Sequence, residues 1–237
     1  MSDLLASLWQ RPADDPVSDL LPNRWDEVFS LRDRLKDYLD RCPRRLHGTI
    51  DPAAIVRGEI VSMGPGSVIE AGAVVHESCR LVLGANSRLR STSLARDEVV
   101  VGSDCLIGAY CELARCIVGS RTATGHWVFV GDSVLGANNM LAGAVFIANT
   151  TLREGRTIRV STPEGEIDSG RTHLGMLSGD GVRFGAQVLV SPGTVVHPGL
   201  IVPPGSVLQG IVDEGRTRAL MAQFRTAWIA PQALEGI

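Results

Sequence analysis

Several features that mark other protein classes are scarce in this chain of 237 residues. Aromatic residues make up 5% of it, the five cysteines are too few for a disulfide scaffold, and no apolar run approaches the roughly 20 residues of a membrane span. The formal net charge is −3 and there is no extended polybasic run, which argues against nucleic acid as a partner. Residues 1–12 lack the basic start and sustained apolar stretch of a signal peptide. We therefore expect a cytoplasmic protein.

What the chain does have is a repeat of six residues. An aliphatic or sulfur-containing residue opens each unit, glycine often follows it, and a small residue stands fifth. Units of this kind open at positions spread through the chain: Met63, Ile69, Val75, Leu83, Val101, Ile107, Leu135, Leu141, Phe184, Val190, Val196 and Val202. Such self-similarity predicts a solenoid, because one unit cannot bury its own apolar face and has to stack on its neighbours.

The spacing indicates how one coil is built. One unit supplies a short extended side and a corner, so three units close a triangular coil, and successive coils pair as parallel strands about 4.8 Å apart. The first and fifth residues of a unit then point inward, the fifth into a corner with little room. Cys79, Cys105 and Cys111 occupy this small position, where we expect buried and unreactive thiols. The chain is predicted to be an all-β protein with a parallel β-helix.

The sequences that flank the repeat favour helices. Residues 1–46 comprise a proline-punctuated stretch, either loosely ordered or docked on the solenoid, and a helix that Asn23 caps and Pro43 ends. We interpret this helix as a lid over the first coil, since solenoids need capped ends. The solenoid covers residues 47–212, and residues 213–237 contain a terminal helix that Pro231 is expected to end.

Two irregularities interrupt the repeat. Between about residues 150 and 180 the six-residue units vanish, and the pattern there predicts a hairpin-like loop excursion. The interval from Val118 to Leu135 is seventeen residues, one short of a whole coil, and His126 lies inside it. An irregularity of this kind re-aims side chains, as bulges do in sheets. His126 is therefore the best functional candidate.

One set of segments carries a resemblance to a known family. The segments are Gly125-His126-Trp127-Val128-Phe129-Val130-Gly131-Asp132-Ser133, Leu135-Gly136-Ala137-Asn138, Ala148-Asn149, Ser178-Gly179-Asp180-Gly181 and Val190-Ser191-Pro192-Gly193-Thr194. Together they resemble the hexapeptide-repeat acetyltransferase domain of bacterial glucosamine-1-phosphate acetyltransferase/uridylyltransferases. They are also similar to the solenoid domain of sugar-1-phosphate nucleotidylyltransferases. The resemblance spans roughly residues 49–207.

This resemblance implies a left-handed β-helix that forms a homotrimer. It also implies that acetyl-coenzyme A, or another acyl-coenzyme A, meets an amino-sugar phosphate in clefts between neighbouring subunits. The sequence assigns no residues to the coenzyme. Uridylyl transfer is not expected, because the chain has no glycine-rich N-terminal segment for a nucleotide.

Four residues carry the site that the resemblance implies. His126 falls on the family's base, which takes a proton from the sugar amine, a task that suits an imidazole. Arg96 matches an arginine that binds the sugar phosphate, Asn149 matches an asparagine that contacts substrate, and His173 stands where the family has a lysine. The alternatives are pairing of Arg96 with the acids after it, a turn role for Asn149 and a surface position for His173.

Other positions depart from the family. Ala114 stands at or next to the position where the family has a phosphate-binding lysine. Phe129 and Thr150 stand where the family has tyrosines, and Met140 where it has an asparagine. Two hypotheses follow. The first is an acyl-coenzyme A dependent N-acyltransferase acting on a sugar-phosphate or nucleotide-sugar-like amine. The second is a non-catalytic trimeric β-helix that serves as a regulatory or assembly module.

A metal enzyme on the same scaffold is a further possibility that the spacing tests. The histidines are dispersed and form no close pair: His47, His76, His126, His173 and His197. Zinc sites need ligands that converge. We therefore expect no metal.

Overall fold

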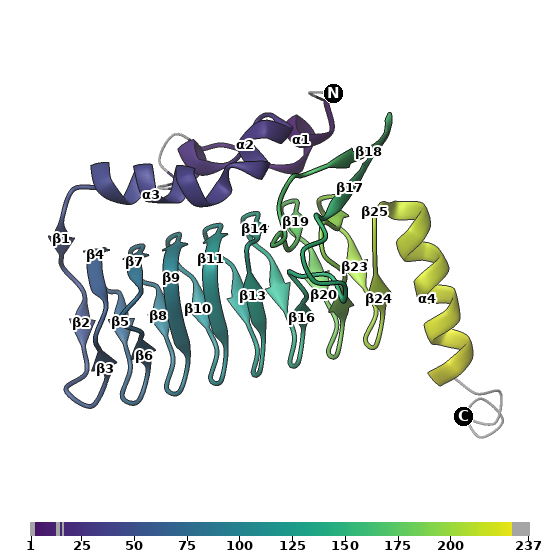
Figure 1. Ribbon diagram of the computed structural model, residues 1–237. Helices are drawn as coiled ribbons and strands as arrows, with labels where there is room; N and C mark the ends of the chain where they lie inside the picture. Colours follow the sequence, from purple (N-terminus) through teal and green to yellow (C-terminus); the bar gives the residue numbers. More distant parts are fainter. Residues whose placement is uncertain (1–2, 13–14, 16, 229–237) are drawn as a thin grey trace, which may run out of the picture.

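The chain winds into a three-sided rod of parallel coils, with helices along one side and at one end (Figure 1). The computed structural model describes residues 3–12, 15 and 17–228. Strands pair in parallel with their counterparts one coil away, so that Val68 lies beside Arg88 and Ile69 beside Leu89. The predicted all-β, left-handed parallel β-helix, with a helical segment at each end and one hairpin-like excursion, is confirmed.

Three faces make up the rod, and we name them by what lies on their outer side. The covered face consists of β1 (Arg45–Leu46), β4 (Glu59–Met63), β7 (Arg80–Leu83), the second halves of β9 (Leu94–Val101) and β11 (Glu112–Val118), β14 (Val134–Leu135), β19 (Leu177–Ser178), β22 (Val195–Val196) and β25 (Ile211–Val212). The apolar face consists of β3 (Ile55–Val56), β6 (Val74–Val75), the first halves of β9 and β11, β13 (Phe129–Gly131), β16 (Phe146–Ile147), β21 (Leu189–Val190) and β24 (Val207–Leu208). The mixed face consists of β2 (Thr49–Ile50), β5 (Val68–Ile69), β8 (Arg88–Leu89), β10 (Leu106–Ile107), β12 (Ala123–Thr124), β15 (Met140–Leu141), β20 (Arg183–Phe184) and β23 (Ile201–Val202).

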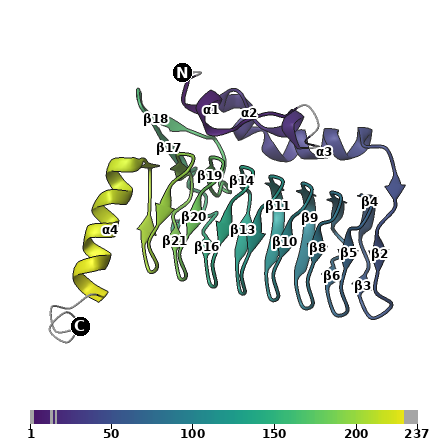
Figure 2. The same cartoon turned by 180° about the vertical axis from the view of Figure 1, so that it is seen from behind.

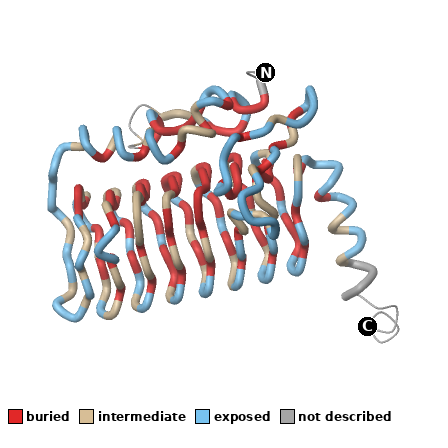
Figure 3. The backbone as a smooth tube through the Cα atoms, in the orientation of Figure 1, coloured by how far each residue is buried: buried red, intermediate tan, exposed pale blue. Residues whose placement is uncertain are grey.

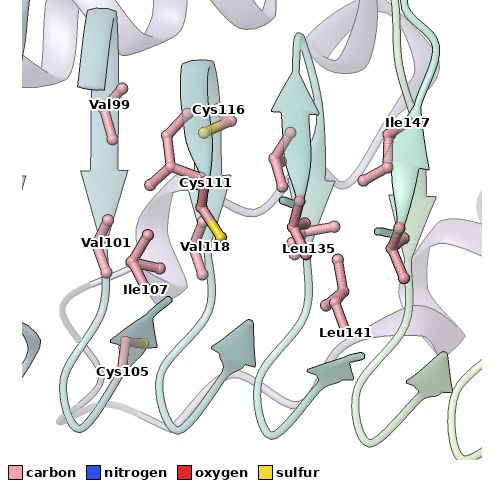
Figure 4. Close-up of a cluster of buried hydrophobic side chains, with 14 of the residues drawn as sticks. Val99, Val101, Cys105, Ile107, Cys111, Cys116, Val118, Leu135, Leu141 and Ile147 are labelled. Carbon is pink, nitrogen blue, oxygen red and sulfur yellow. The ribbon is translucent and has the colours of Figure 1, made fainter. Parts of the chain in front are cut away.

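The interior of the rod is a continuous aliphatic core. Inward side chains from successive coils stack above one another, and Figure 4 shows Val101, Val118 and Leu135 in such a row. Cys79, Cys105 and Cys111 are 1%, 2% and 1% exposed, so the thiols that the repeat predicts to be buried are buried. Burial raises the pKa of the Cys105 thiol to about 11, because a thiolate loses its hydration inside an apolar core.

A second apolar cluster lies outside the rod, on the covered face. Outward side chains of this face form a stripe along the coils: Val61, Val82, Val100, Ile117, Val134, Leu177 and Val195. The N-terminal segment buries the stripe with α1 (Asp3–Leu8), a 3-10 turn (Ser18–Leu20), α2 (Trp25–Phe29) and α3 (Leu31–Arg41). Seen from behind in Figure 2, these helices lie along the coils, and Figure 3 shows the buried residues that face each other across the contact. Burial on both sides turns this face into an internal layer.

Two details of the N-terminal prediction are wrong. The helix expected from Asn23 is divided at Ser30 into α2 and α3, and Arg24 precedes α2 without a side-chain cap. The helices also lie lengthwise on the covered face and not over the first coil, since α3 contacts β9 and its Leu35 and Leu39 belong to the apolar cluster of that face. The segment before them is docked as well, because the indole of Trp9 donates a hydrogen bond to the carbonyl oxygen of Ser178 at 2.8 Å. The physical reason is the outward apolar stripe, which needs cover along its whole length. For residues 3–12, the docked alternative is therefore the correct one.

The excursion and the C-terminal helix complete the chain. Strands β17 (Arg159–Thr162) and β18 (Gly165–Asp168) form an antiparallel hairpin whose Ile158 and Val160 extend the cluster on the covered face. Helix α4 (Glu214–Trp228) contacts β23 and β25, and its Leu220 packs against the core at the end of the rod. Pro231, which the sequence suggests as the end of this helix, lies outside the described residues.

Candidate functional site

His126 lies at the corner between the mixed face and the apolar face, which we call the His126 edge. It follows β12 and precedes β13, and its side chain is exposed. Its carbonyl oxygen accepts a hydrogen bond from the amide of Ala144 one coil further on, at 2.8 Å. The imidazole meets the ring of Trp127 edge-on, with 6.3 Å between the ring centroids. An outward imidazole at this corner is available to exchange protons with a bound molecule.

The irregularity of the repeat is not at His126, which corrects one step of the sequence interpretation. The register between β9 and β11 shifts between Ala114 and Cys116, where the later coil has one residue fewer at its corner. Val118 then pairs with Leu135 seventeen residues on, and Thr124 pairs with Leu141 at the same interval. The coil from Val118 to Leu135 is short at the same corner, where Asp132 and Ser133 separate Gly131 from Val134 as Arg115 and Cys116 separate Ala114 from Ile117. His126 stands at a regular corner.

The shortened corner belongs to a second edge, between the apolar and covered faces, which we call the arginine edge. Asp97, Arg115 and Asp132 follow one another there in successive coils, and each has a positive φ, of 59°, 49° and 48°. Arg115 binds both acids: Nε and Nη2 donate to the two carboxylate oxygens of Asp132, each at 2.8 Å, and Nη1 donates to Asp97. Such a two-pronged pair combines charge with fixed geometry.

Asp132 is the centre of this network and is 3% exposed. It also accepts hydrogen bonds from Arg32 Nε on α3 at 3.1 Å and from Asn149 Nδ2 at 2.6 Å. Burial disfavours the charged carboxylate, but the contacts with Arg115, Asn149 and Arg32 together outweigh it and lower the pKa of Asp132. The network therefore ties the N-terminal helices to the rod through an ionised aspartate.

Arg96 is held by acids at the same edge. Its Nε donates to Glu112 Oε1 at 2.6 Å and its Nη1 donates to Asp97 Oδ2 at 3.0 Å. The pairing with Asp97 that the sequence offers as the alternative is present. A phosphate would have to compete with two carboxylates for this guanidinium, so phosphate binding by Arg96 stays a prediction.

His173 lines a small crevice between α2, α3 and the end of the excursion. The crevice has a volume of about 190 Å³ and is lined by Val28, Phe29, Leu31, Arg32, Asp132, Gly170, Arg171, Thr172, His173 and Leu174. Within it, Nδ1 of His173 lies 3.1 Å from the hydroxyl of Thr172, and Arg171 Nε donates to the carbonyl oxygen of Phe29 at 2.5 Å. His173 is exposed, and Asp132 connects its crevice to Asn149.

The four candidates thus separate into two groups within one chain. Arg96, Asn149 and His173 belong to the arginine edge and its crevice, whereas His126 belongs to the next edge of the prism. Strand β13 and its flanks lie between His126 and Asp132, which are six residues apart in the sequence, a stretch that spans at most about 20 Å when extended. No single chain brings the imidazole and the arginine edge into one contact set among the described residues.

Three polar residues of the arginine edge were missed by the sequence interpretation as site components: Arg32, Arg115 and Asp132. Asp132 had a signal, since it ends the Gly-Asp pair of the segment that carries the family resemblance. Arg115 had none, because it stands between residues that are buried in the core. Arg32 is one hundred residues from Asp132 in the sequence, and only the folded chain joins them.

Three of the four positions that depart from the family carry apolar side chains, and none carries a cation. Ala114 is 0% exposed and offers no cation, and the rings of Phe129 and Phe146 stack with centroids 5.0 Å apart on the apolar face. Met140 projects from the mixed face with 46% of its surface exposed, and Thr150 is exposed at the start of the excursion. These side chains present little for a phosphate to bind.

Sequence comparison finds relatives that agree with the resemblance. No protein-family model matches the chain. The chain is 32% identical over 112 residues to bifunctional protein GlmU of Cyanothece sp. (strain PCC 7425 / ATCC 29141), a match that covers 42% of this chain and 25% of the relative. It is 30% identical over 100 residues to uncharacterized acetyltransferase YaiX of Escherichia coli O6:K15:H31, covering 42% of this chain and 43% of the relative. The chain is similar to hexapeptide-repeat acetyltransferases.

The resemblance predicted from the sequence is confirmed at this level. The match to GlmU of Methanocaldococcus jannaschii is longer, 25% identical over 176 residues, and covers 71% of this chain and 41% of the relative. The chain therefore spans less than half the length of these curated relatives. A solved structure, UDP-N-acetylglucosamine acyltransferase from Campylobacter jejuni, covers 76% of this chain and 85% of its own, with 14% identity and a TM-score of 0.41. Similarity at that score carries no information on activity.

Two searches of the described residues bear on other kinds of site. None of the helices that the structure describes combines the length and the apolar character that a bilayer crossing requires. Within the same residues, no three histidine, cysteine or acidic side chains are grouped as metal ligands would be.

Proposed function

We propose that the chain is an acyl-coenzyme A dependent N-acyltransferase, with acetyl-coenzyme A as the donor and a sugar-phosphate or nucleotide-sugar-like amine as the acceptor. The observation that carries the proposal is the exposed imidazole of His126, at a corner of the rod within the Gly-His and Gly-Asp segment. Sequence similarity to GlmU and to the acetyltransferase YaiX supports the reaction class. The cytoplasm is the compartment that we expect.

The proposed reaction gives His126 one task. The acceptor nitrogen attacks the thioester carbonyl, a C–N bond forms, and His126 takes the proton that the nitrogen loses. The tetrahedral intermediate collapses as the C–S bond breaks, and the thiolate of coenzyme A leaves and takes up a proton. No acyl-enzyme is needed, because the donor already holds an activated acyl group.

A complete acceptor site in this proposal is shared between copies of the chain. His126 and the trio of Arg96, Asn149 and His173 occupy different edges of one rod, so a second copy is needed to bring one edge opposite the other. The apolar face supports self-association, since its outward residues are hydrophobic along most of its length: Ile55, Val74, Leu94, Phe129, Phe146, Leu189 and Val207. Contiguous exposed apolar surface of this kind marks an interface. We propose a homotrimer.

A second candidate is a trimeric module without catalysis. The apolar residues Ala114, Phe129 and Met140 at family substrate positions favour it, and so do the ion pairs that occupy Arg96. Such a protein would keep the rod and the interface while serving regulation or assembly.

Isothermal titration calorimetry with acetyl-coenzyme A separates the two candidates. The transferase proposal predicts a binding isotherm for the assembled protein, and then release of free thiol in a screen of amino sugars that includes glucosamine 1-phosphate. His126→Ala is the matched control, because it should bind the coenzyme and release little thiol. Absence of any heat at millimolar acetyl-coenzyme A would remove the transferase proposal and leave the module.

A further inference from the structure

Two exposed aromatic rings stand side by side at the His126 edge. Tyr110 and Trp127 come from successive coils, and their rings stack with centroids 5.9 Å apart and planes at 25°. Tyr110 is 58% exposed and Trp127 is 65% exposed, whereas Trp9 and Trp25 are 5% and 7% exposed. Only 5% of the chain is aromatic, so two exposed aromatic rings in contact with each other form an unusual patch on its surface.

Both rings are carried by a backbone conformation that disfavours bulky side chains. Tyr110 has a φ of 58° and Trp127 a φ of 56°, in the left-handed region. Glycine takes the equivalent corner in two other coils, as Gly72 and Gly205 with φ of 73° and 71°, and Thr92, Ala144 and Gln187 take it with φ of 64°, 60° and 60° in three more. Folding alone would be served better by glycine at this corner. Since other coils also place a non-glycine residue at this corner, what sets Tyr110 and Trp127 apart is the size and the exposure of their rings.

The register of the coils leaves one side of the indole open. The backbone N–H of Trp127 donates to the carbonyl oxygen of Ala109 in the previous coil, and the backbone N–H of Ala144 in the next coil donates to the carbonyl oxygen of His126. One face of the indole stacks on Tyr110, so the other is turned toward Ala144, whose side chain ends at Cβ. The following coil places the exposed Gln187 at this corner. The centroids of the indole and the His126 imidazole are 6.3 Å apart. The open indole face and the imidazole therefore border the same stretch of surface.

We propose that Trp127, backed by Tyr110, is the surface on which the sugar ring of the acceptor stacks, with its amine directed to His126. This proposal rests on the proposed function. The C–H groups on one face of a pyranose ring fit the electron-rich face of an indole, as they do the faces of other aromatic side chains. Trp127 then fixes the orientation of the acceptor, while the proton goes to His126.

Steady-state kinetics of thiol release test the proposal, with glucosamine and glucosamine 1-phosphate as acceptors. Trp127→Ala should raise KM for the acceptor at least tenfold, while KM for acetyl-coenzyme A stays within twofold of wild type. Trp127→Phe keeps a ring and should retain most of the affinity. Leu152→Ala is the control, since Leu152 is exposed on the excursion away from this edge. An unchanged acceptor KM in an active Trp127→Ala enzyme overturns the inference and leaves the proposed function intact.

Binding is tested separately from turnover by tryptophan fluorescence. Glucosamine 1-phosphate should quench the emission of the wild type and not that of Trp127→Phe. Trp9 and Trp25, the other tryptophans whose side chains the structure describes, are buried and out of reach of the sugar. This measurement also decides the inference if no acceptor supports turnover. Absence of quenching at millimolar sugar phosphate then counts against it.

The proposal and a purely structural role predict different outcomes for Trp127→Gly. Under the proposal, its melting temperature should be no lower than that of the wild type, because glycine suits the positive φ, while the affinity for the acceptor is lost. A clear fall in melting temperature, or a change of oligomeric state in sedimentation experiments, would assign the aromatic pair to folding or to the subunit interface.

Discussion

Replacing Arg115 by methionine should destabilise the protein more than any surface arginine replacement. Its guanidinium is the bidentate partner of Asp132 and also binds Asp97, and the Asp132 side chain is 4% exposed. Removing one member of a buried pair leaves a charge without its main partner, which costs about 3 kcal/mol. In a protein of this size that corresponds to a fall in melting temperature of roughly 6–12 °C. Arg32 and Asn149 remain and keep the loss from being larger.

The assay is urea unfolding followed by circular dichroism, with the double variant Arg115→Met/Asp132→Asn and the exposed control Arg57→Met. The double variant should lose less than the sum of the two single changes, because each single change removes the same pair. The sign with pH follows from the lowered pKa of Asp132: its contribution is complete above the ordinary aspartate value of about 3.9 and is lost as pH falls through the lower folded value. The stability difference between wild type and Asp132→Asn should therefore vanish in acid. A stability loss in Arg115→Met no greater than in Arg57→Met would refute the reasoning.

Three further predictions follow from the packing. Gly108→Ala should unfold or severely destabilise the rod, because an added Cβ would lie 1.7 Å from a backbone oxygen of the next coil, whereas Gly199→Ala has open space around it and should cost only about 1–2 kcal/mol for its φ of 72°; thermal melts of the pair compare them. Val100→Asp should release the N-terminal helices from the covered face, detected as faster proteolysis of that segment, while Leu106→Asp, 37% exposed on the mixed face, should not. A thiol reagent should modify Cys42 in the native protein and all five cysteines after unfolding, as counted by mass spectrometry; rapid native modification of the four buried thiols would contradict the packing.

The rod itself was predictable because its signal is local and repeated. A buried aliphatic every six residues fixes which side chains point inward, and Ile69, Val101 and Leu141 are all 0% exposed as that pattern requires. The covered face also had a signal that was not used. Val100-Val101 and Val134-Leu135 are apolar pairs, and a strand buried on both sides reads as a continuous apolar run.

The candidate site was only partly accessible from the sequence. The outward direction of His126 follows from its place as the third residue of a unit, because the first and fifth residues, Thr124 and Val128, are the ones that point inward. The interval between Val118 and Leu135 shows that this coil is short but not at which of its corners, and only the strand pairing places the shortening at Asp132 and not at His126. The ion pair of Arg32 with Asp132 depends on where the helices dock, which no local pattern encodes.

The most direct test of the proposed function is the rate of thiol release from acetyl-coenzyme A by the wild type and by His126→Ala, measured with the best amino-sugar acceptor. A positioned base contributes roughly 100- to 10,000-fold to a rate, so His126→Ala should lose at least about a hundredfold in kcat. Its melting temperature should match the wild type, because the imidazole is exposed. Equal rates for the two proteins would show that His126 is not the base and would contradict the central claim.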